Sequence, residues 1–374
     1  MLKRIWSISI KEFIHLRNDW WLPAFMLFGG AMELLLVGWA TSRPITNLPI
    51  MVFDQDQSRV SREIITALEN TETFELDSYV SSIDEIQLAM DHGDINTAII
   101  FPQDFGEEVA AHNGHPQLPV ILNGAESIPA TAALRAIEGV ALEYGEKIIV
   151  QRIGMSPKEF AGFDLSLRVW FNESLSEALY TTPAELALML EFTILLFAAL
   201  TFSRERELGT LEQLLVMPFS SLEIIIGKSI PVIIIGVFDF ILMLSLTHSI
   251  FGVPVRGSLI LLLILLFIYI FVELGKGLVI SVMSRTQHQA FLLVMLIGMT
   301  DFMFTGYAAP VESMPEFMQT LANVIPAHHW LFIVRGILLK GSGLDILWPH
   351  VLALLILGLL IGSFSLRYVR KALD

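Results

Sequence analysis

The chain contains no cysteine among its 374 residues and has few charged side chains, 16% of the total. Without cysteine the protein can form neither disulfides nor thiolate metal sites. Soluble domains carry about 25% charged residues. The shortage of charge, together with 54% hydrophobic residues, therefore excludes an ordinary soluble globule. The shortage is local, because residues 44–182 have a soluble composition and the remainder is a series of apolar runs.

Basic residues are also scarce, and the net charge of −15 comes almost entirely from one segment. Residues 43–182 hold 22 acidic and 8 basic side chains, a net charge of −14. Such an acidic segment argues against nucleic acid as a partner, since phosphate contacts need Lys and Arg.

Apolar runs long enough to cross a bilayer account for most of the remaining chain. A transmembrane helix needs about 20 such residues, and six segments qualify: 22–41, 183–203, 223–251, 258–283, 290–308 and 346–366. The first run is too long for a cleaved signal peptide and lacks a small-residue cleavage site. We therefore predict an α-helical polytopic membrane protein with six transmembrane helices and an inserted α/β extracytoplasmic domain.

The basic residues that flank these runs predict the orientation. With the N-terminus inside, the short outer loops hold only Arg256, Arg335 and Lys340. The cytoplasmic pieces hold Lys3, Arg4, Lys11, Arg17, Arg204, Arg206, Lys228, Arg285, Arg367, Arg370 and Lys371. Both termini are thus predicted to be cytoplasmic. Residues 1–21 form an amphipathic lead-in, whose Ile5 and Ile8 could lie on the membrane interface.

The acidic segment alternates strand-like and helix-like stretches, which predicts a mixed α/β sandwich. Expected strands are 48–53, 74–80, 96–101, 118–122 and 165–171, and expected helices are 58–70, 83–92, 102–111 and 129–153. Asp54 and Asp56 could bind a cation, but paired carboxylates after a strand more often make turn hydrogen bonds. The predicted loops and helix ends also hold three histidines, expected to be solvated rather than metal ligands: His92, His112 and His115. We predict no metal site.

The most informative stretch follows the second run. It is strongly charged at its start, then repeats leucines at helical spacing (Leu208, Leu211, Leu214 and Leu215), and Pro218 ends it. The pattern indicates a short amphipathic helix on the inner surface. That helix could anchor the loop in the interface, or it could dock a cytoplasmic partner.

Residues 204–218 read RERELGTLEQLLVMP, which resembles the signature of type-2 ABC transporter permeases of the drug- and lipid-exporter kind. The resemblance implies that this segment is the coupling helix that contacts the ATPase. The residues it assigns to coupling are Arg204, Glu205, Arg206, Glu207, Gly209, Thr210, Leu211 and Glu212.

Two further motifs support the resemblance. Residues 306–315 (GYAAPVESMP) are similar to the family's G-x-x-x-P-x-E-x-M-P, carried here by Gly306, Pro310, Glu312 and Pro315. Residues 277–281 (GLVIS) and 286–290 (TQHQA) match a third pattern. The resemblance implies short outer-leaflet re-entrant helices within 309–345, and the prolines there fit a segment too interrupted to span.

The resulting domain prediction covers the whole chain. It runs as a lead-in (1–21), a first span (22–41), an outer domain (42–182), a second span (183–203), a coupling loop (204–222), spans three to five (223–308), re-entrant helices (309–345), a sixth span (346–366) and a cytoplasmic tail (367–374).

Among the ionisable residues inside the predicted spans, six are candidates for a translocation path or for intramembrane pairs: Glu33, Glu191, Asp239, Glu273, Lys276 and Asp301. Each would cost about 2.5–3.5 kcal/mol at a helix centre facing lipid, so they should face the bundle, a cavity or each other. Glu273 and Lys276 are three residues apart and can pair on one helix face. Glu33, Glu191 and Asp301 are predicted either to line a path for a cationic or amphipathic substrate or to be buried at a subunit interface.

No catalytic motif is present: there is no phosphate loop, no Gly-x-Ser-x-Gly and no His-Glu-x-x-His. The resemblance implies a non-catalytic permease in the bacterial inner membrane, with ATP and Mg²⁺ bound by a separate cytoplasmic ABC ATPase. Other implied partners are a second or related permease, membrane lipid and a periplasmic adaptor. An ion-coupled secondary carrier and a membrane-anchored sensor or scaffold are the alternatives.

Overall fold

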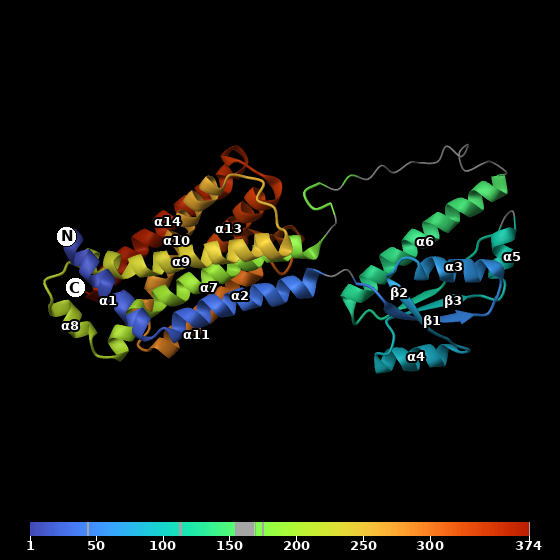
Figure 1. Ribbon diagram of the computed structural model, residues 1–374, viewed down its shortest axis with the longest axis horizontal. Helices are drawn as coiled ribbons and strands as arrows, with labels where there is room; N and C mark the ends of the chain where they lie inside the picture. The colour runs from blue at the N-terminus through green and yellow to red at the C-terminus, as the bar shows by residue number, and fades with distance from the viewer. Residues whose placement is uncertain (43–44, 112–113, 154–167, 169, 174–175, 374) are drawn as a thin grey trace. The chain divides into compact units, whose positions relative to one another are not determined.

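The computed structural model describes residues 1–42, 45–111, 114–153, 168, 170–173 and 176–373. The chain forms two compact units. One comprises Met1–Arg43 and Arg168–Asp374 and is helical, and the other, Pro44–Leu167, contains a β-sheet (Figure 1).

The helical unit contains long apolar helices and several short ones. They are α1 (Leu2–Asn18), α2 (Trp21–Ser42), α7 (Glu177–Glu207), α8 (Leu211–Val216), α9 (Ser221–Phe251), α10 (Leu259–Met283), α11 (Gln287–Phe304), η1 (Val311–Ser313), α12 (Glu316–Ala322), α13 (Pro326–Arg335), the π-helical turn η2 (Gly336–Lys340) and α14 (Leu344–Leu373).

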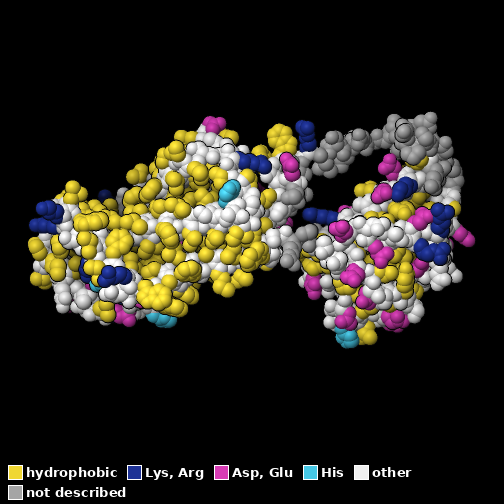
Figure 2. All heavy atoms as spheres, viewed as in Figure 1, with side chains coloured by type: hydrophobic (Ala, Val, Ile, Leu, Met, Phe, Trp, Pro, Cys, Tyr) yellow, Lys and Arg dark blue, Asp and Glu magenta, His cyan; other side chains and the backbone are white. Residues whose placement is uncertain are grey.

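Helix α7 forms the centre of this unit. It packs against α2, α9, α10, α11 and α13, and 94% of its most apolar stretch is buried, compared with 11% for α2 and 17% for α14. The outer helices leave large apolar side chains uncovered, such as Phe28 (75% exposed) and Leu359 (71% exposed). Figure 2 shows hydrophobic side chains spread over this surface. Such continuous apolar exposure requires lipid or a partner to cover it.

Within the part of the chain that the structure describes, five helices are long and apolar enough to cross a membrane, namely α2, α7, α9, α10 and α14. Counting a bent pair as one span gives up to six: α12 and residues Pro326–Lys340 are bent by 82° at a short break. The polytopic helical class is therefore confirmed. The predicted fifth span, 290–308, corresponds to the 18-residue α11, which is not among these five because it begins with Gln287-His288-Gln289 and carries Asp301.

The lead-in differs from the expected interfacial helix. Ile5, Ile8 and Ser9 of α1 are buried, and α1 packs along α9. The Ser9 hydroxyl donates to the Gly227 carbonyl at 2.8 Å. Part of the apolar face that was predicted to enter the membrane interface therefore packs against α9 instead.

The second unit is built around a four-stranded sheet in the order β2-β1-β3-β4. Strands β1, β2 and β3 are parallel and β4 runs antiparallel to β3. Its elements are β1 (Leu48–Asp54), α3 (Arg59–Glu69), β2 (Phe74–Tyr79), α4 (Ile83–His92), β3 (Thr97–Phe101), α5 (Phe105–Ala110), β4 (Val120–Leu122) and α6 (Ser127–Ile153).

The sheet buries both faces. Ile50 and Val52 pack with apolar residues of α3 and α6, whereas Met51 and Phe53 pack with α4. Alternate residues of β1 therefore point to opposite layers, and Figure 1 shows α4 across the sheet from α3 and α6. Most of the strand expected at 165–171 lies outside the described residues. Helix α7, which corresponds to the predicted second span (183–203), starts before that span, at Glu177.

The carboxylates after β1 make turn and capping contacts. Asp54 Oδ1 accepts from the backbone N–H groups of Asp56 and Gln57 at 3.1 and 2.8 Å, and its Oδ2 accepts from the Ser61 hydroxyl at 2.7 Å. Asp56 Oδ2 accepts from the N–H of Gly106 at 3.0 Å. Both side chains thus hold the loop before α3 in place.

Candidate functional site

The predicted coupling segment is two helices rather than one. Helix α7 continues through Glu207, and Gly209 then adopts a positive φ of 69°, which ends the helix. A second helix, α8, starts at Leu211. The leucine spacing suggested a single helix because Leu208 and Leu211 are three residues apart, but the left-handed glycine between them turns the chain.

Glu205 connects this loop to the helical bundle. Its carboxylate contacts Lys11 of α1, lies 3.0 Å from Lys228 Nζ of α9, and accepts a hydrogen bond from the Thr210 hydroxyl just before α8. The side chain of Glu205 is only 4% exposed. A buried charge with several partners fixes its neighbours closely, because removing any one leaves the others uncompensated.

Lys228 completes this group, which we call the coupling cluster (Lys11, Glu12, Glu205, Thr210 and Lys228). Its ammonium also donates to Glu12 Oε1 at 2.6 Å and to the Thr201 carbonyl at 3.1 Å. The cluster therefore joins α1, α7, α9 and the start of α8. This arrangement was not predicted from the sequence, although a lysine five residues inside the predicted span 223–251 was a signal that a partner exists.

Two neighbouring charged residues tie the end of α7 to the end of α10 and the start of α11. Arg206 donates to the carbonyls of Val282 and Ser284, both at 2.9 Å. Glu207 accepts from the N–H of Gln287, the first residue of α11, at 2.7 Å. Arg204 instead pairs with Asp19 at 3.2 Å.

One face of α8 is left uncovered by this chain. Leu214 is buried at 4% exposure, but Leu208, Val216 and Met217 are 59%, 87% and 49% exposed, and Glu212 is exposed beside them. A hollow of about 410 Å³ separates α8 from α1. The loop thus exposes apolar side chains together with the acidic Glu212. The hydrogen bond from Thr210 to Glu205 connects the start of α8 to the coupling cluster.

The intramembrane charges form a second group, which we call the Lys276 cluster. Lys276 Nζ lies 2.6 Å from Asp301 Oδ2, 2.8 Å from Glu273 Oε2 and 3.1 Å from Glu191 Oε1. The three carboxylates come from α7, α10 and α11, and Glu191 and Glu273 are fully buried. One ammonium with three carboxylates has a formal charge of −2 if all are ionised, so the cluster favours protons or a cation.

The remaining predicted charges lie apart from this cluster. Asp239 is buried at 1% exposure on α9. Glu33 on α2 is exposed in this chain. Sequence analysis missed Glu185, which lies inside the predicted second span, is 2% exposed and has the Tyr307 hydroxyl as a hydrogen-bond partner.

The motif at residues 306–315 shapes the chain after α11. Gly306 has a positive φ of 85°, and its carbonyl accepts from Tyr180 Oη at 3.1 Å and from Arg335 at 3.2 Å. Pro310 precedes η1 and Pro315 precedes α12. Glu312 is exposed, and its backbone carbonyl accepts from the Gln319 side chain.

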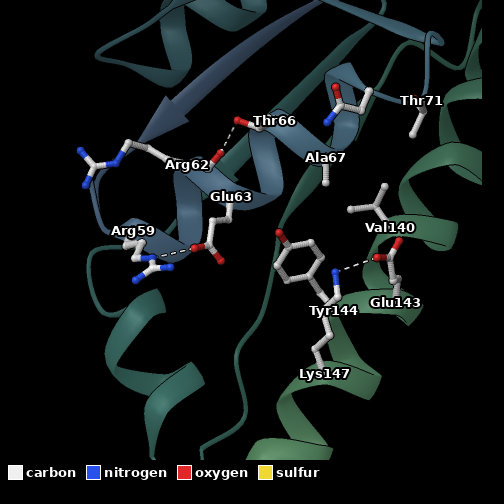
Figure 3. A pocket seen from close by; sticks show the side chains of 11 residues that line it. Arg59, Arg62, Glu63, Thr66, Ala67, Thr71, Val140, Glu143, Tyr144 and Lys147 are labelled. Carbon is white, nitrogen blue, oxygen red and sulfur yellow. Dashed lines mark hydrogen bonds and ion pairs between the residues drawn. The ribbon is translucent and has the colours of Figure 1, made fainter. Parts of the chain in front are cut away.

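The sheet unit has an open hollow of about 690 Å³ between α3 and α6 (Figure 3). Two ion pairs lie along it, Arg59 with Glu63 and Lys147 with Glu143, each at 2.7 Å, whereas Arg62, which also lines the hollow, has no ion pair among the described residues. The hydrogen bond from Lys147 to Glu143 raises the pKa of that lysine. Lys147 also lies over the Tyr144 ring, 4.6 Å from its centroid. This surface therefore offers a ligand few unpaired groups.

Comparison with known proteins identifies the family. The profile described as ABC-2 family transporter protein matches residues 20–367. The chain belongs to the ABC-2 transporter family. The resemblance drawn from the three motifs is confirmed, and the ion-coupled carrier and the sensor are set aside.

Three similar proteins each cover 95% or more of this chain. The probable multidrug ABC transporter permease YbhR of Escherichia coli K12 is 29% identical over 99% of both chains. The inner membrane transport permease YhhJ of the same organism is 26% identical over 100% of this chain and 98% of its own. The ABC transporter G family member 20 of Dictyostelium discoideum is 23% identical over 95% of this chain and 49% of its own.

Proposed function

We propose that this ABC-2 protein is the permease subunit of an ATP-driven exporter in a bacterial inner membrane. It works as a dimer with itself or a related permease, together with two ABC ATPase subunits that bind ATP and Mg²⁺. The observation that carries the proposal is the coupling cluster. It fixes the start of α8 to three bundle helices while α8 leaves Glu212, Val216 and Met217 uncovered.

The coupling cluster supports a mechanical route from ATPase to bundle. Closure of the two ATPases would displace α8, and Thr210 and Glu205 would pass this displacement to Lys228 on α9 and Lys11 on α1. Helix α7 packs against α2, α9, α10, α11 and α13 as well as α8, so movement of its end reaches the whole bundle. Packed helices respond to such a force by shifting between discrete arrangements.

The coupling role is tested with a co-purified ABC ATPase in nanodiscs. Glu212→Lys should abolish stimulation of ATP hydrolysis by the permease, and Gly209→Pro should do the same because proline cannot adopt a positive φ. Glu316→Lys is the matched control. Glu316 also lies exposed in the first turn of a short helix, so the helix-dipole penalty is the same. Equal loss of stimulation by Glu212→Lys and Glu316→Lys would contradict the assignment.

The Lys276 cluster supports a cationic or amphipathic substrate of the drug or lipid kind. Its surplus of carboxylates attracts positive charge, and relatives carry names that include multidrug permease. ATP-driven uptake of a cationic dye into inverted vesicles, which corresponds to export from the cytoplasm, is measured for Glu191→Gln and Asp301→Asn to test this role. A strong decrease in export by both variants is expected, and wild-type export by both would exclude a transport path here.

We further propose six spans, with α11 as the fifth. Helix α11 begins where Gln287 meets Glu207 at the end of α7, and the chain just after it returns to Tyr180 in the first turn of α7. It therefore runs antiparallel along the full length of a span. Its 18 residues extend about 27 Å, close to the bilayer's hydrocarbon thickness of about 30 Å.

In this topology both termini are cytoplasmic and the Pro44–Leu167 unit is extracytoplasmic, where it could meet a periplasmic adaptor. The chain has no cysteine, so single introduced cysteines give clean labelling. A membrane-impermeant maleimide added to intact spheroplasts should label Asp94→Cys and spare Lys371→Cys. Labelling of both variants before membrane rupture would contradict the topology.

A further inference from the structure

Three histidines meet near the start of the last long helix. His328 and His329 of α13 and His350 of α14 each place one ring nitrogen within 4.8 Å of the other two. His329 is 4% exposed, and the other two rings are partly buried. The group is thus sheltered, yet open enough for a small ion to enter.

Hydrogen bonds to backbone carbonyls set the tautomers of two of these rings. His329 Nε2 lies 2.9 Å from the Asn323 carbonyl oxygen, which can only accept, so Nε2 carries the proton and Nδ1 presents a lone pair. His328 Nδ1 lies 3.4 Å from the Thr305 carbonyl, and this contact likewise directs the lone pair to Nε2. Histidines that bind metals commonly donate their other N–H to a carbonyl in this way.

The spacing of the ring nitrogens suits a tetrahedral ion. Zinc–nitrogen bonds of about 2.0–2.1 Å in tetrahedral geometry place two ligand nitrogens about 3.3 Å apart. His329 Nδ1, the nitrogen with the lone pair, lies 3.0 Å from His350 Nδ1. The His350 ring is held in place by stacking on Phe332, with the centroids 3.8 Å apart. A ring nitrogen of His328 lies within 4.8 Å of both of the other histidines, so the three rings would turn toward a common point to reach bonding distance.

We propose that His328, His329 and His350 bind a divalent transition-metal ion of the zinc class, with water as the fourth ligand. Neutral imidazoles suit this class of ion. Such an ion would clamp α13 to α14 and, through the His329 contact to Asn323, fix the end of α12. Without a metal, the same arrangement would be explained by a single hydrogen bond from His350 Nδ1–H to His329 Nδ1. His328 takes no part in that hydrogen bond.

That difference in the role of His328 gives the decisive experiment. The full chain, purified in nanodiscs without a histidine tag and treated with a chelator, is titrated with Co²⁺, whose tetrahedral complexes absorb in the visible range, and then with Zn²⁺. We expect one Co²⁺ per chain, displaced by Zn²⁺. His328→Gln and His350→Gln should each weaken binding by at least about 100-fold, beyond the usual effect of losing a supporting contact.

His288→Gln is the control, since His288 is exposed on α11. It should bind Co²⁺ like the wild-type chain. Zn²⁺ should raise the thermal midpoint of the wild type and His288→Gln but not of His328→Gln. Absence of stoichiometric binding, or wild-type affinity in His328→Gln, would overturn the proposal and leave a metal-free hydrogen bond between His329 and His350.

Discussion

Lys228 Nζ lies 3.0 Å from Glu205 Oε1, and this contact joins helix α9 to the last turn of α7. Both side chains are almost fully buried, at 1% and 4% exposure. Because the same carboxylate holds Thr210 at the start of α8, the ion pair lies between the proposed ATPase-docking helix and the bundle.

Lys228→Met should both destabilise the protein and uncouple it. The substitution leaves the buried Glu205 and the partly buried Glu12 without this ammonium, and breaking a buried pair by removing one partner costs about 3–5 kcal/mol. Thermal unfolding in detergent measures the first effect, and stimulation of the co-purified ATPase measures the second. Lys3→Met, at an exposed position on α1, should change neither. Wild-type stimulation by folded Lys228→Met would show that the pair is only structural.

Gly209→Ala should reduce coupling while the chain remains folded. A left-handed residue other than glycine costs roughly 1–2 kcal/mol, and no atom lies within 4 Å of the added methyl group, so the strain is purely in the backbone. Gly252→Ala is a matched control, with a φ of 66° and equally open space at the end of α9. Both variants should lose similar stability, but only Gly209→Ala should lower ATPase stimulation. Equal stimulation in the two variants would contradict a special role for the turn.

Local signals predicted much of the architecture. The apolar run at 48–53 is β1, and Ser58 caps α3 by accepting from the N–H groups of Val60 and Ser61. Five predicted spans correspond to helices with the expected length and hydropathy. These features depend on residues close in sequence, which is why composition and periodicity reveal them.

The contacts within both charge clusters could not be predicted in the same way. Lys228 and Glu12 are 216 positions apart, and Lys276 and Glu191 are 85 apart. Sequence analysis predicted the pair of Glu273 and Lys276 because it lies within one helix face, but the addition of Asp301 depends on how α10 and α11 pack. The histidine group is a similar case, since His350 lies on a different helix from His328 and His329.

Substitutions in the Lys276 cluster should be strongly asymmetric. Lys276→Met leaves three carboxylates without their shared partner and should cost about 3–5 kcal/mol. Glu191→Gln removes one of the surplus negative charges and retains an oxygen that can accept from Lys276, so its cost should be less than half as large. Thermal midpoints in nanodiscs give the comparison. A double variant, Lys276→Met with Asp301→Asn, should recover part of the loss, whereas a fully additive loss would show that the carboxylates are not coupled through the lysine.

Arg335→Lys should loosen the α13 segment. The Arg335 guanidinium donates to the Gly306 carbonyl at 3.2 Å and the Tyr180 carbonyl at 3.1 Å, and it lies over the Tyr180 ring, 3.8 Å from the centroid. Lysine cannot reproduce this planar, forked arrangement, and a hydrogen bond to a charged group contributes about 1.5–3 kcal/mol. We therefore expect a loss of roughly that size in unfolding free energy and faster amide exchange in α13. Arg256→Lys is the control. The Arg256 guanidinium donates to the Leu339 carbonyl at 3.1 Å, and a lysine can retain this contact. If Arg335→Lys matched that control in both measurements, the guanidinium would not be what holds α13 against α7 and the turn after α11.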